Sequence, residues 1–204
     1  MNYLLFIVLG YLSGSILFAY YLPLWLKKVD ITEGTPDGNP GAFNCIARVG
    51  KPLGLFALFC DLMKGTLVVV WAAHVLDMGR WEFALVLAAP VAGHAYSAFR
   101  RFRGGKAIAV TFGVLLGLFP VWQPFGLLAA SYLFFSLVVC VRPNRYRSII
   151  TFLCFGLGSV VWMPGTAISL GCILAAGVVV SRHWEGELEE EKPTARFLLS
   201  RRGR

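Results

Sequence analysis

The residues of this chain best suited to chemistry lie in a polar, glycine-rich loop, Asp37-Gly38-Asn39-Pro40-Gly41-Ala42-Phe43-Asn44. Gly38 and Gly41 allow the backbone to reach φ > 0, so successive N–H groups can converge on an anion. Arg48 and Lys51 follow closely and add positive charge. The loop therefore predicts a site that binds a phosphate-bearing substrate. An ordinary tight turn between two helices would use the same residue types.

Asp61 and Lys64 form a second polar group, within an otherwise apolar stretch. Their spacing places both on one helical face, where they can pair. Ionisable side chains inside a membrane helix are costly and more often mark function than structure. We therefore assign Asp61 and Lys64, together with Asp37, to the support of the site. A buried ion pair that only holds two helices together is the alternative.

A third group joins His94 to the sequence Gly104-Gly105-Lys106. The two glycines predict a flexible turn before a helix, and the N-terminus of a helix favours anions. A lysine there opposes the helix dipole, which suggests that Lys106 has another task. This is not a nucleotide-binding P-loop, because Arg100 stands where the first Gly is needed and Ala107 where Ser or Thr is needed. A packed histidine and a lysine that only orients the chain are the alternatives.

His183 follows Arg182 at the end of the last apolar stretch. An imidazole at that position could act as a general base or hold a phosphate. The chain has no set of Cys and His at metal-ligand spacing, so we predict neither a metal nor an organic cofactor.

Composition predicts an integral membrane protein. The chain is 57% hydrophobic and 15% charged, whereas a soluble domain is about 25% charged. The net charge of +8 could indicate a nucleic-acid partner. The basic residues, however, lie in short loops beside apolar stretches, where orientation signals belong, so we predict no nucleic-acid binding.

Apolar stretches predict an all-α protein with seven transmembrane helices. Three cover about 3–26, 53–76 and 81–99. The uncharged runs 107–141 and 149–181 are each too long for one span, since about 20 residues cross a bilayer. Prolines interrupt both runs near the middle, so each should form a helical hairpin.

Charge predicts the orientation of these helices. With the N-terminus outside, nearly all of the 19 Lys and Arg residues lie inside, Lys64 and Arg80 excepted. The polar loop, the basic cluster 100–106 and the C-terminus then face the cytoplasm. We expect one domain, 1–204, with a charged tail from about 182 to 204. A site built from these parts would face cytoplasmic solutes and the inner leaflet together.

The motifs also resemble the PlsY family, bacterial inner-membrane glycerol-3-phosphate acyltransferases. The resemblance covers about the first 115 residues and rests on several motifs in the same order and at nearly the same spacing. These motifs are Gly10-Tyr11-Leu12-Ser13-Gly14-Ser15, Gly38-Asn39-Pro40-Gly41-Ala42-Phe43-Asn44, Gly50-Lys51, Gly54, Asp61-Leu62-Met63-Lys64-Gly65, Gly93-His94 and Phe102-Arg103-Gly104-Gly105-Lys106.

The resemblance implies transfer of a fatty acyl group from acyl-phosphate to the 1-hydroxyl of glycerol 3-phosphate, giving lysophosphatidic acid and phosphate. Its implied partners are the two substrates and membrane lipid, and the oligomeric state is left open. Asn39, Gly41, Asn44 and Arg48 would hold the phosphate of the acceptor. Lys106, Gly104 and Gly105 would hold the acyl-phosphate. His183 or His94 would orient or deprotonate the acceptor hydroxyl.

Departures from the family pattern indicate a divergent member. Asp37 stands in place of a Ser, Phe43 in place of a Thr, and Gly186 in place of an Asn. The family Arg falls at Ala47, with Arg48 one residue later, which rotates the side chain by about 100° on a helix. An anion at Asp37 must be paired, for instance with Arg48. A non-catalytic membrane protein that binds phospholipid or another anion on the same scaffold is the second hypothesis.

Overall fold

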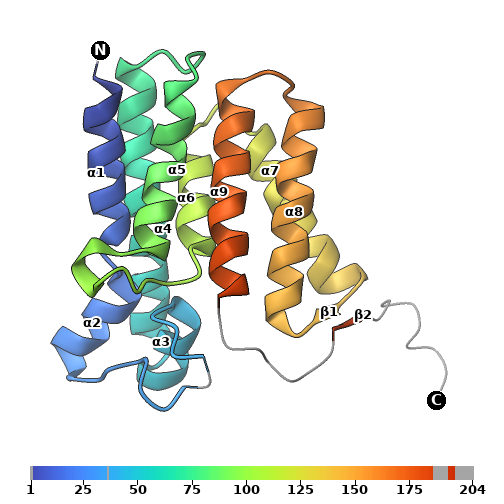
Figure 1. Ribbon diagram of the computed structural model, residues 1–204. Coiled ribbons are helices and arrows are strands. Elements are labelled where there is room, and N and C mark those ends of the chain that lie inside the picture. The colour runs from blue at the N-terminus through green and yellow to red at the C-terminus, as the bar shows by residue number, and fades with distance from the viewer. Residues whose placement is uncertain (1, 36, 186–192, 196–204) are drawn as a thin grey trace.

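The computed structural model describes residues 2–35, 37–185 and 193–195, and over these residues the protein is mainly helical (Figure 1). In chain order the helices are α1 (Tyr3–Ser15), α2 (Phe18–Lys27), α3 (Ala42–Val49), α4 (Lys51–Val75), α5 (Glu82–Ala95), the 3-10 helix η1 (Ala98–Arg100), α6 (Ile108–Leu116), α7 (Gln123–Leu133), the π-helix η2 (Phe134–Val138), α8 (Asn144–Trp162) and α9 (Ala167–Trp184). Helices α1, α5, α9 and α8 stand side by side, and α4 packs on α6.

One small sheet departs from the all-α prediction. The two-residue strands β1 (Val141–Arg142) and β2 (Thr194–Ala195) pair antiparallel. The pair joins the segment between η2 and α8 to residues beyond α9, so it links parts of the chain far apart in sequence. Gly186, the predicted departure near the C-terminus, and most of the charged tail lie outside the described residues.

Within the described residues, three helical segments are long and apolar enough to cross a membrane by themselves. They are α4, α5 extended through η1, and α9. The bent pair α1–α2 could form a fourth span, and the shorter apolar helix α7 continues through η2 to Val138. The structure thus agrees with a helical membrane protein, while the count of seven spans stays a prediction.

The first predicted span is not one straight helix. Helices α1 and α2 meet at an angle of 45° around Ile16 and Leu17. The buried pair Asp61–Lys64 of α4 binds both sides of this break. Lys64 Nζ donates to Ile16 O at 2.6 Å, and the Asp61 carboxylate accepts the N–H groups of Phe18 and Ala19 at 3.3 and 3.4 Å. The backbone groups freed by the break are therefore satisfied by side chains from another helix.

Unlike the bend between α1 and α2, two breaks were predicted from the sequence, at the prolines that interrupt the long apolar runs. Helix α6 ends at Leu116 and α7 begins at Gln123, on either side of Pro120. Helix α8 ends at Trp162 and α9 begins at Ala167, on either side of Pro164. These hairpins place α6 beside α7 and α8 beside α9, and α7 also packs on α8.

Glycines let neighbouring helices of the bundle approach closely, both α4 with α6 and α1 with α5. A Cβ on Gly113 of α6 would collide with the carbonyl oxygen of Leu62 on α4, and one on Gly93 of α5 would collide with that of Tyr11 on α1. Small residues at helix contacts are typical of membrane proteins. In lipid the hydrophobic effect does not drive helices together, so they associate through close van der Waals packing of their backbones.

We expect Gly113→Ala to lower the melting temperature in detergent micelles. The obstacle is backbone, which no rotamer change can relieve, and such overpacking costs about 1–3 kcal/mol. Gly177→Ala in α9 is the matched control, since a Cβ there meets nothing within 4 Å. Equal melting temperatures for the two variants would contradict the close α4–α6 contact.

Candidate functional site

A cavity of about 730 Å³ lies between the polar loop and helices α4, α5, α6, α7, α8 and α9. One part of its lining is apolar, with Leu58, Leu62, Ile108, Phe112, Leu116 and Phe125. The other part is polar, with Asp37, Asn39, Asn44, His94, Lys106, Asn144, Arg147, Ser148 and His183. The cavity can therefore hold a molecule with a charged head and a long apolar chain.

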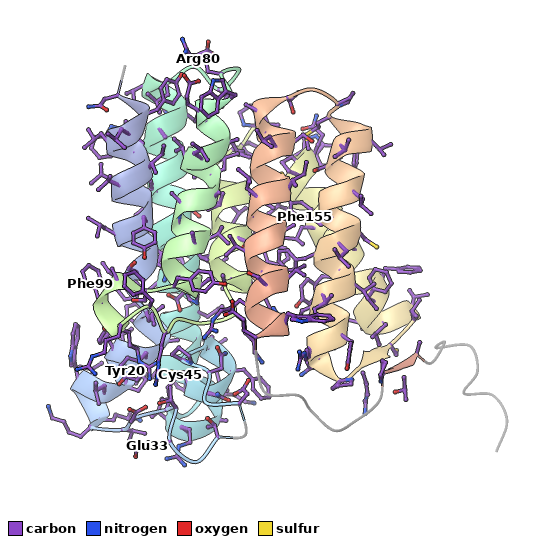
Figure 2. The ribbon with its side chains drawn as sticks, in the orientation of Figure 1. Tyr20, Glu33, Cys45, Arg80, Phe99 and Phe155 are labelled. Atoms are coloured by element: carbon purple, nitrogen blue, oxygen red, sulfur yellow. The ribbon has the colours of Figure 1, made fainter. Side chains whose placement is uncertain are left out.

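A small apolar cluster holds the polar loop in place beside this cavity. Ala19 of α2, Ile31 of the loop, Cys45 of α3 and Ala57 of α4 are fully buried against one another. In Figure 2, Cys45 and Glu33 lie at one end of the molecule and Arg80 at the other. The loop and the cavity thus share one end of the helical bundle.

Asp37 binds the polar groups of the loop to Lys106. Its carboxylate accepts hydrogen bonds from Lys106 Nζ at 2.6 Å, Asn44 Nδ2 at 2.9 Å and the Asn39 N–H at 3.2 Å. Asn44 also donates to Asn39 O at 2.9 Å. The predicted pairing of Asp37 with Arg48 is therefore wrong, because Lys106 is the cation that reaches it.

The Asp37–Lys106 pair persists at neutral pH. Burial raises the pKa of the Asp37 carboxyl, but the hydrogen bonds from Lys106 and Asn44 and the charge of Lys106 outweigh it, so the pKa lies below its usual range. Because the folded-state pKa is lowered, the pair contributes stability above the unfolded-state pKa and loses it as pH falls through the lowered value. Both side chains remain more than a third exposed, so a ligand can reach them.

Two helix N-termini open onto the same cavity. Ala42 and Phe43 begin α3, and Ile108 and Ala109 begin α6, and all four line the cavity. Neither helix has a side-chain cap. The first N–H groups of a helix have no intrahelical partner and attract anions. Together with Lys106, these helix ends form an electropositive rim that fits phosphate groups.

The glycines of the polar loop and of the 104–105 turn act differently from the prediction. Gly38 has a positive φ of 52°, but Gly41 has an extended φ of −108°, which any residue can adopt. The N–H groups of Gly104 and Gly105 donate to Ala95 O and His94 O. They are thus not free to bind phosphate; these two glycines instead let the turn press against the end of α5.

His94 lies at the end of α5, beside the buried pair of α4. Its Nδ1 is 2.8 Å from Lys64 Nζ, which also binds Asp61 Oδ1 at 2.7 Å. His94 and Asp61 line the cavity, and Lys64 lies behind them. The predicted supporting residues Asp61 and Lys64 therefore hold both the α1–α2 break and His94.

His183 enters the cavity from the last turn of α9. Its Nδ1 donates to the carbonyl oxygen of Val179 at 2.8 Å, because a carbonyl can only accept. In the neutral ring Nε2 then carries a lone pair, and it has no hydrogen-bond partner among the described residues. Arg182, next to His183, donates to Gly104 O at 3.1 Å and ties α9 to the glycine turn.

Like Lys64, Gly104 and Gly105, two further predicted residues do not line the cavity, and the cationic residue Arg147 was missed. Arg48 and Lys51 are exposed and do not line it. Arg147 of α8 does line it, and its Nε is buried without a hydrogen-bond partner among the described residues. Among those residues, no group of three or more His, Cys, Asp or Glu could hold a metal ion.

The fold and the site define a helical membrane protein with an amphipathic cavity lined by Lys106 and the N-termini of two helices. Residues 4–187 match the family model described as Glycerol-3-phosphate acyltransferase. The chain belongs to this family, which confirms the resemblance found in its motifs.

Curated relatives and a solved structure agree with this assignment. The chain is 36% identical to a glycerol-3-phosphate acyltransferase of Pseudomonas aeruginosa (strain LESB58) over 86% of this chain and 89% of that protein. It is 38% identical to glycerol-3-phosphate acyltransferase 2 of Bacillus cereus (strain ATCC 10987 / NRS 248) over 89% of this chain and 87% of that protein. Its fold matches a crystal structure of PlsY (YgiH), an integral membrane glycerol 3-phosphate acyltransferase in its glycerol 3-phosphate form, with a TM-score of 0.77, 27% identity, and 91% and 90% of the two chains covered.

Proposed function

We propose that this protein transfers a fatty acyl group from acyl-phosphate to the 1-hydroxyl of glycerol 3-phosphate, an early step of phospholipid synthesis. Family membership supports the acyltransferase class and the glycerol 3-phosphate acceptor. The observation that carries the proposal for this chain is the cavity, in which Lys106 and two helix N-termini meet an apolar arm. An acyl-phosphate has this combination of anionic head and long chain.

The two substrates present two phosphate groups, and the polar end offers cations on two sides. Lys106 and the start of α3 lie on the side of the loop, and Arg147 lies on the side of α8. We assign the acceptor phosphate to the loop, with Asn39, Gly41 and Asn44, and the acyl-phosphate to Lys106, the start of α6 and Arg147. Binding both substrates in one cavity raises their effective concentration and aligns the reacting atoms.

In this scheme the 1-hydroxyl oxygen attacks the acyl carbon. A C–O ester bond forms, and the C–O bond to the phosphate breaks. The hydroxyl proton passes to His183 Nε2, the free acceptor of the cavity, and then to the departing phosphate. Lys106 and the helix N–H groups stabilise the charge on that phosphate, since preorganised donors act most strongly where charge develops.

The placement in the membrane follows the charge pattern of the sequence. We propose a single domain of seven spans in the bacterial inner membrane, with the N-terminus outside and the cavity facing the cytoplasm. The polar loop and the basic turn at Arg100 lie at the same end of the molecule, opposite Arg80 (Figure 2), which supports this orientation. Lipid would enter from the inner leaflet, and glycerol 3-phosphate from the cytoplasm.

Phosphate release from palmitoyl-phosphate by the purified protein tests the proposal. We expect release that depends on glycerol 3-phosphate, together with lysophosphatidic acid in equal amount. No release above that of a Lys106→Gln variant would instead support a non-catalytic lipid- or anion-binding protein. The ion pair of Lys106 with Asp37 is the observation that favours this second function, because Asp37 already neutralises the positive charge that a substrate phosphate would need.

We expect Asp37→Ser to lower the KM for glycerol 3-phosphate about tenfold. The carboxylate repels a phosphate bound at the loop, and two like charges about 4 Å apart cost roughly 1–4 kcal/mol near a protein surface. Initial rates at saturating palmitoyl-phosphate give the KM. Glu33→Ser is the control, since it removes a carboxylate from an exposed position of the same loop. A higher KM in Asp37→Ser would mean that Asp37 holds Lys106 where the acceptor needs it.

A further inference from the structure

The two histidines of the cavity differ in what holds their Nδ1 atoms. His183 Nδ1 faces a carbonyl oxygen, whereas His94 Nδ1 faces the ammonium group of Lys64. Both rings are nearly buried, with 3% and 4% of their surface exposed. Neither Nε2 has a hydrogen-bond partner among the described residues. The atom that each histidine leaves for a ligand is therefore Nε2.

The three protons of Lys64 fix the proton of His94. Lys64 Nζ has three acceptors, namely Ile16 O at 2.6 Å, Asp61 Oδ1 at 2.7 Å and His94 Nδ1 at 2.8 Å. An ammonium group has three N–H donors and no lone pair, so His94 Nδ1 must accept. The proton of the neutral imidazole is then on Nε2. His94 thus offers a donor to the cavity, and His183 offers an acceptor.

Asp61 keeps Lys64 in the charged form that this arrangement needs. The Asp61 carboxylate accepts Lys64 Nζ and the two N–H groups at the start of α2. Burial of both side chains opposes their charged forms, and we take the three hydrogen bonds to the Asp61 carboxylate and its contact with the ammonium group to outweigh that cost. The side chains of Lys64 and Asp61 are only 3% and 2% exposed, so water does not compete for these bonds.

Gly105 leaves the Nε2 atom of His94 accessible. A Cβ at this position would lie 2.5 Å from Nε2. The turn cannot move away easily, because the N–H groups of Gly104 and Gly105 are bonded to the last carbonyls of α5. His94 itself lines the cavity, as do Asp61 and Leu62 of α4.

We infer that His94 is a hydrogen-bond donor to the substrate, with Asp61 and Lys64 as the positioning residues that fix its Nε2–H tautomer. The inference rests on the proposed function and refines it. On this inference its N–H faces the acyl-phosphate group, at an oxygen that gains negative charge as the acyl group is transferred. His94 is thereby excluded as the base, and that task falls to His183.

Nitrogen-15 NMR of the imidazole rings tests the tautomers directly. The chain has three histidines, so protein labelled in its histidine rings and kept in detergent micelles gives three sets of signals. In the variants His94→Gln and His183→Gln one set of signals disappears, which assigns that set to the substituted histidine. We expect His94 to carry its proton on Nε2 and His183 on Nδ1 at neutral pH. An Nδ1–H tautomer or an imidazolium at His94 would overturn the inference. This readout needs no activity, so it stands apart from the test of the proposed function.

The positioning role has its own readout. In the double variant Asp61→Asn/Lys64→Met both charges leave together, which avoids an unpaired buried charge. The His94 signals should then shift to a mixture of both tautomers. An unchanged Nε2–H tautomer in the folded double variant would remove Lys64 as the residue that fixes the proton.

A matched pair of amides tests the donor in catalysis. The amide nitrogen of His94→Gln reaches the position of Nε2, whereas that of His94→Asn reaches the position of Nδ1. We expect kcat to fall less than about tenfold in His94→Gln and about 10²–10³-fold in His94→Asn, as for the loss of one preorganised donor. The KM for glycerol 3-phosphate should change little in either. Equal losses in the two variants, with equal melting temperatures, would reduce His94 to a packing residue.

Discussion

Replacing Lys106 by Gln is expected to lower kcat for acyl transfer about 10²–10³-fold, the usual effect of removing one charge-stabilising group from a preorganised site. Lys106 lies just before α6 and lines the cavity, with its Nζ bonded to Asp37 Oδ2 at 2.6 Å. In the proposed reaction this cation balances the negative charge of the departing phosphate. Because the side chain is only partly buried, its loss should leave the fold intact.

Lys28→Gln is the matched control for the loss of a positive charge. Lys28 ends α2, is exposed and does not line the cavity. Its rate should equal that of the wild type, and Lys106→Arg should retain part of the activity, because the charge remains but the head group is larger. Steady-state phosphate release from palmitoyl-phosphate with saturating glycerol 3-phosphate measures all three. A rate near that of the wild type in Lys106→Gln would remove Lys106 from the reaction.

Breaks caused by local sequence could be predicted, and a break caused by tertiary contacts could not. Pro120 and Pro164 each lie near the middle of an apolar run that is too long for one span, so the breaks between α6 and α7 and between α8 and α9 follow from the sequence. The bend at Ile16 has no proline. It depends on Asp61 and Lys64, which are distant in the chain and supply the bonds that the broken helix lacks. The sequence showed that this pair was costly, but not what it binds.

The candidate site was predicted best for residue types that seldom occur in membrane helices or at their ends without a functional role. Asn44 was chosen as part of the polar loop, and His94, Lys106 and His183 as polar residues beside apolar stretches; all four line one cavity. Arg48 was chosen for its nearness in sequence to the polar loop. On α3, however, its side chain is exposed, because only the start of that short helix faces the cavity.

Arg147 was missed because an arginine beside a membrane span resembles an orientation signal. The spacing of Arg147 and its polar neighbours could nevertheless have indicated a role in the site. Asn144, Arg147 and Ser148 are three and four residues apart, so one face of a helix that begins at Asn144 carries all three. Three polar side chains on one face predict a polar contact, but only the hairpin of α8 and α9 shows that the contact is the cavity.

His183→Ala is expected to lower kcat about 10²–10⁴-fold, the range found for loss of a general base. The bond from His183 Nδ1 to Val179 O leaves Nε2 as the acceptor in the cavity, and Ala offers no acceptor. The effect should lie in kcat more than in the KM for glycerol 3-phosphate, because the proposed scheme assigns the acceptor phosphate to the polar loop. The palmitoyl-phosphate assay, run over a range of glycerol 3-phosphate concentrations, separates the two constants.

The chain supplies a close control in His74. Its Nδ1 binds the carbonyl oxygen of Val70 at 2.7 Å, also four residues earlier in the helix, but His74 is exposed and lies in the last turn of α4 away from the cavity. His74→Ala therefore removes the same intrahelical bond without touching the site, and its kcat should equal that of the wild type. If both variants lost activity equally, the bond to the helix would matter and the free Nε2 would not. A loss confined to His183→Ala, with an unchanged melting temperature, is what an acceptor for the hydroxyl proton requires.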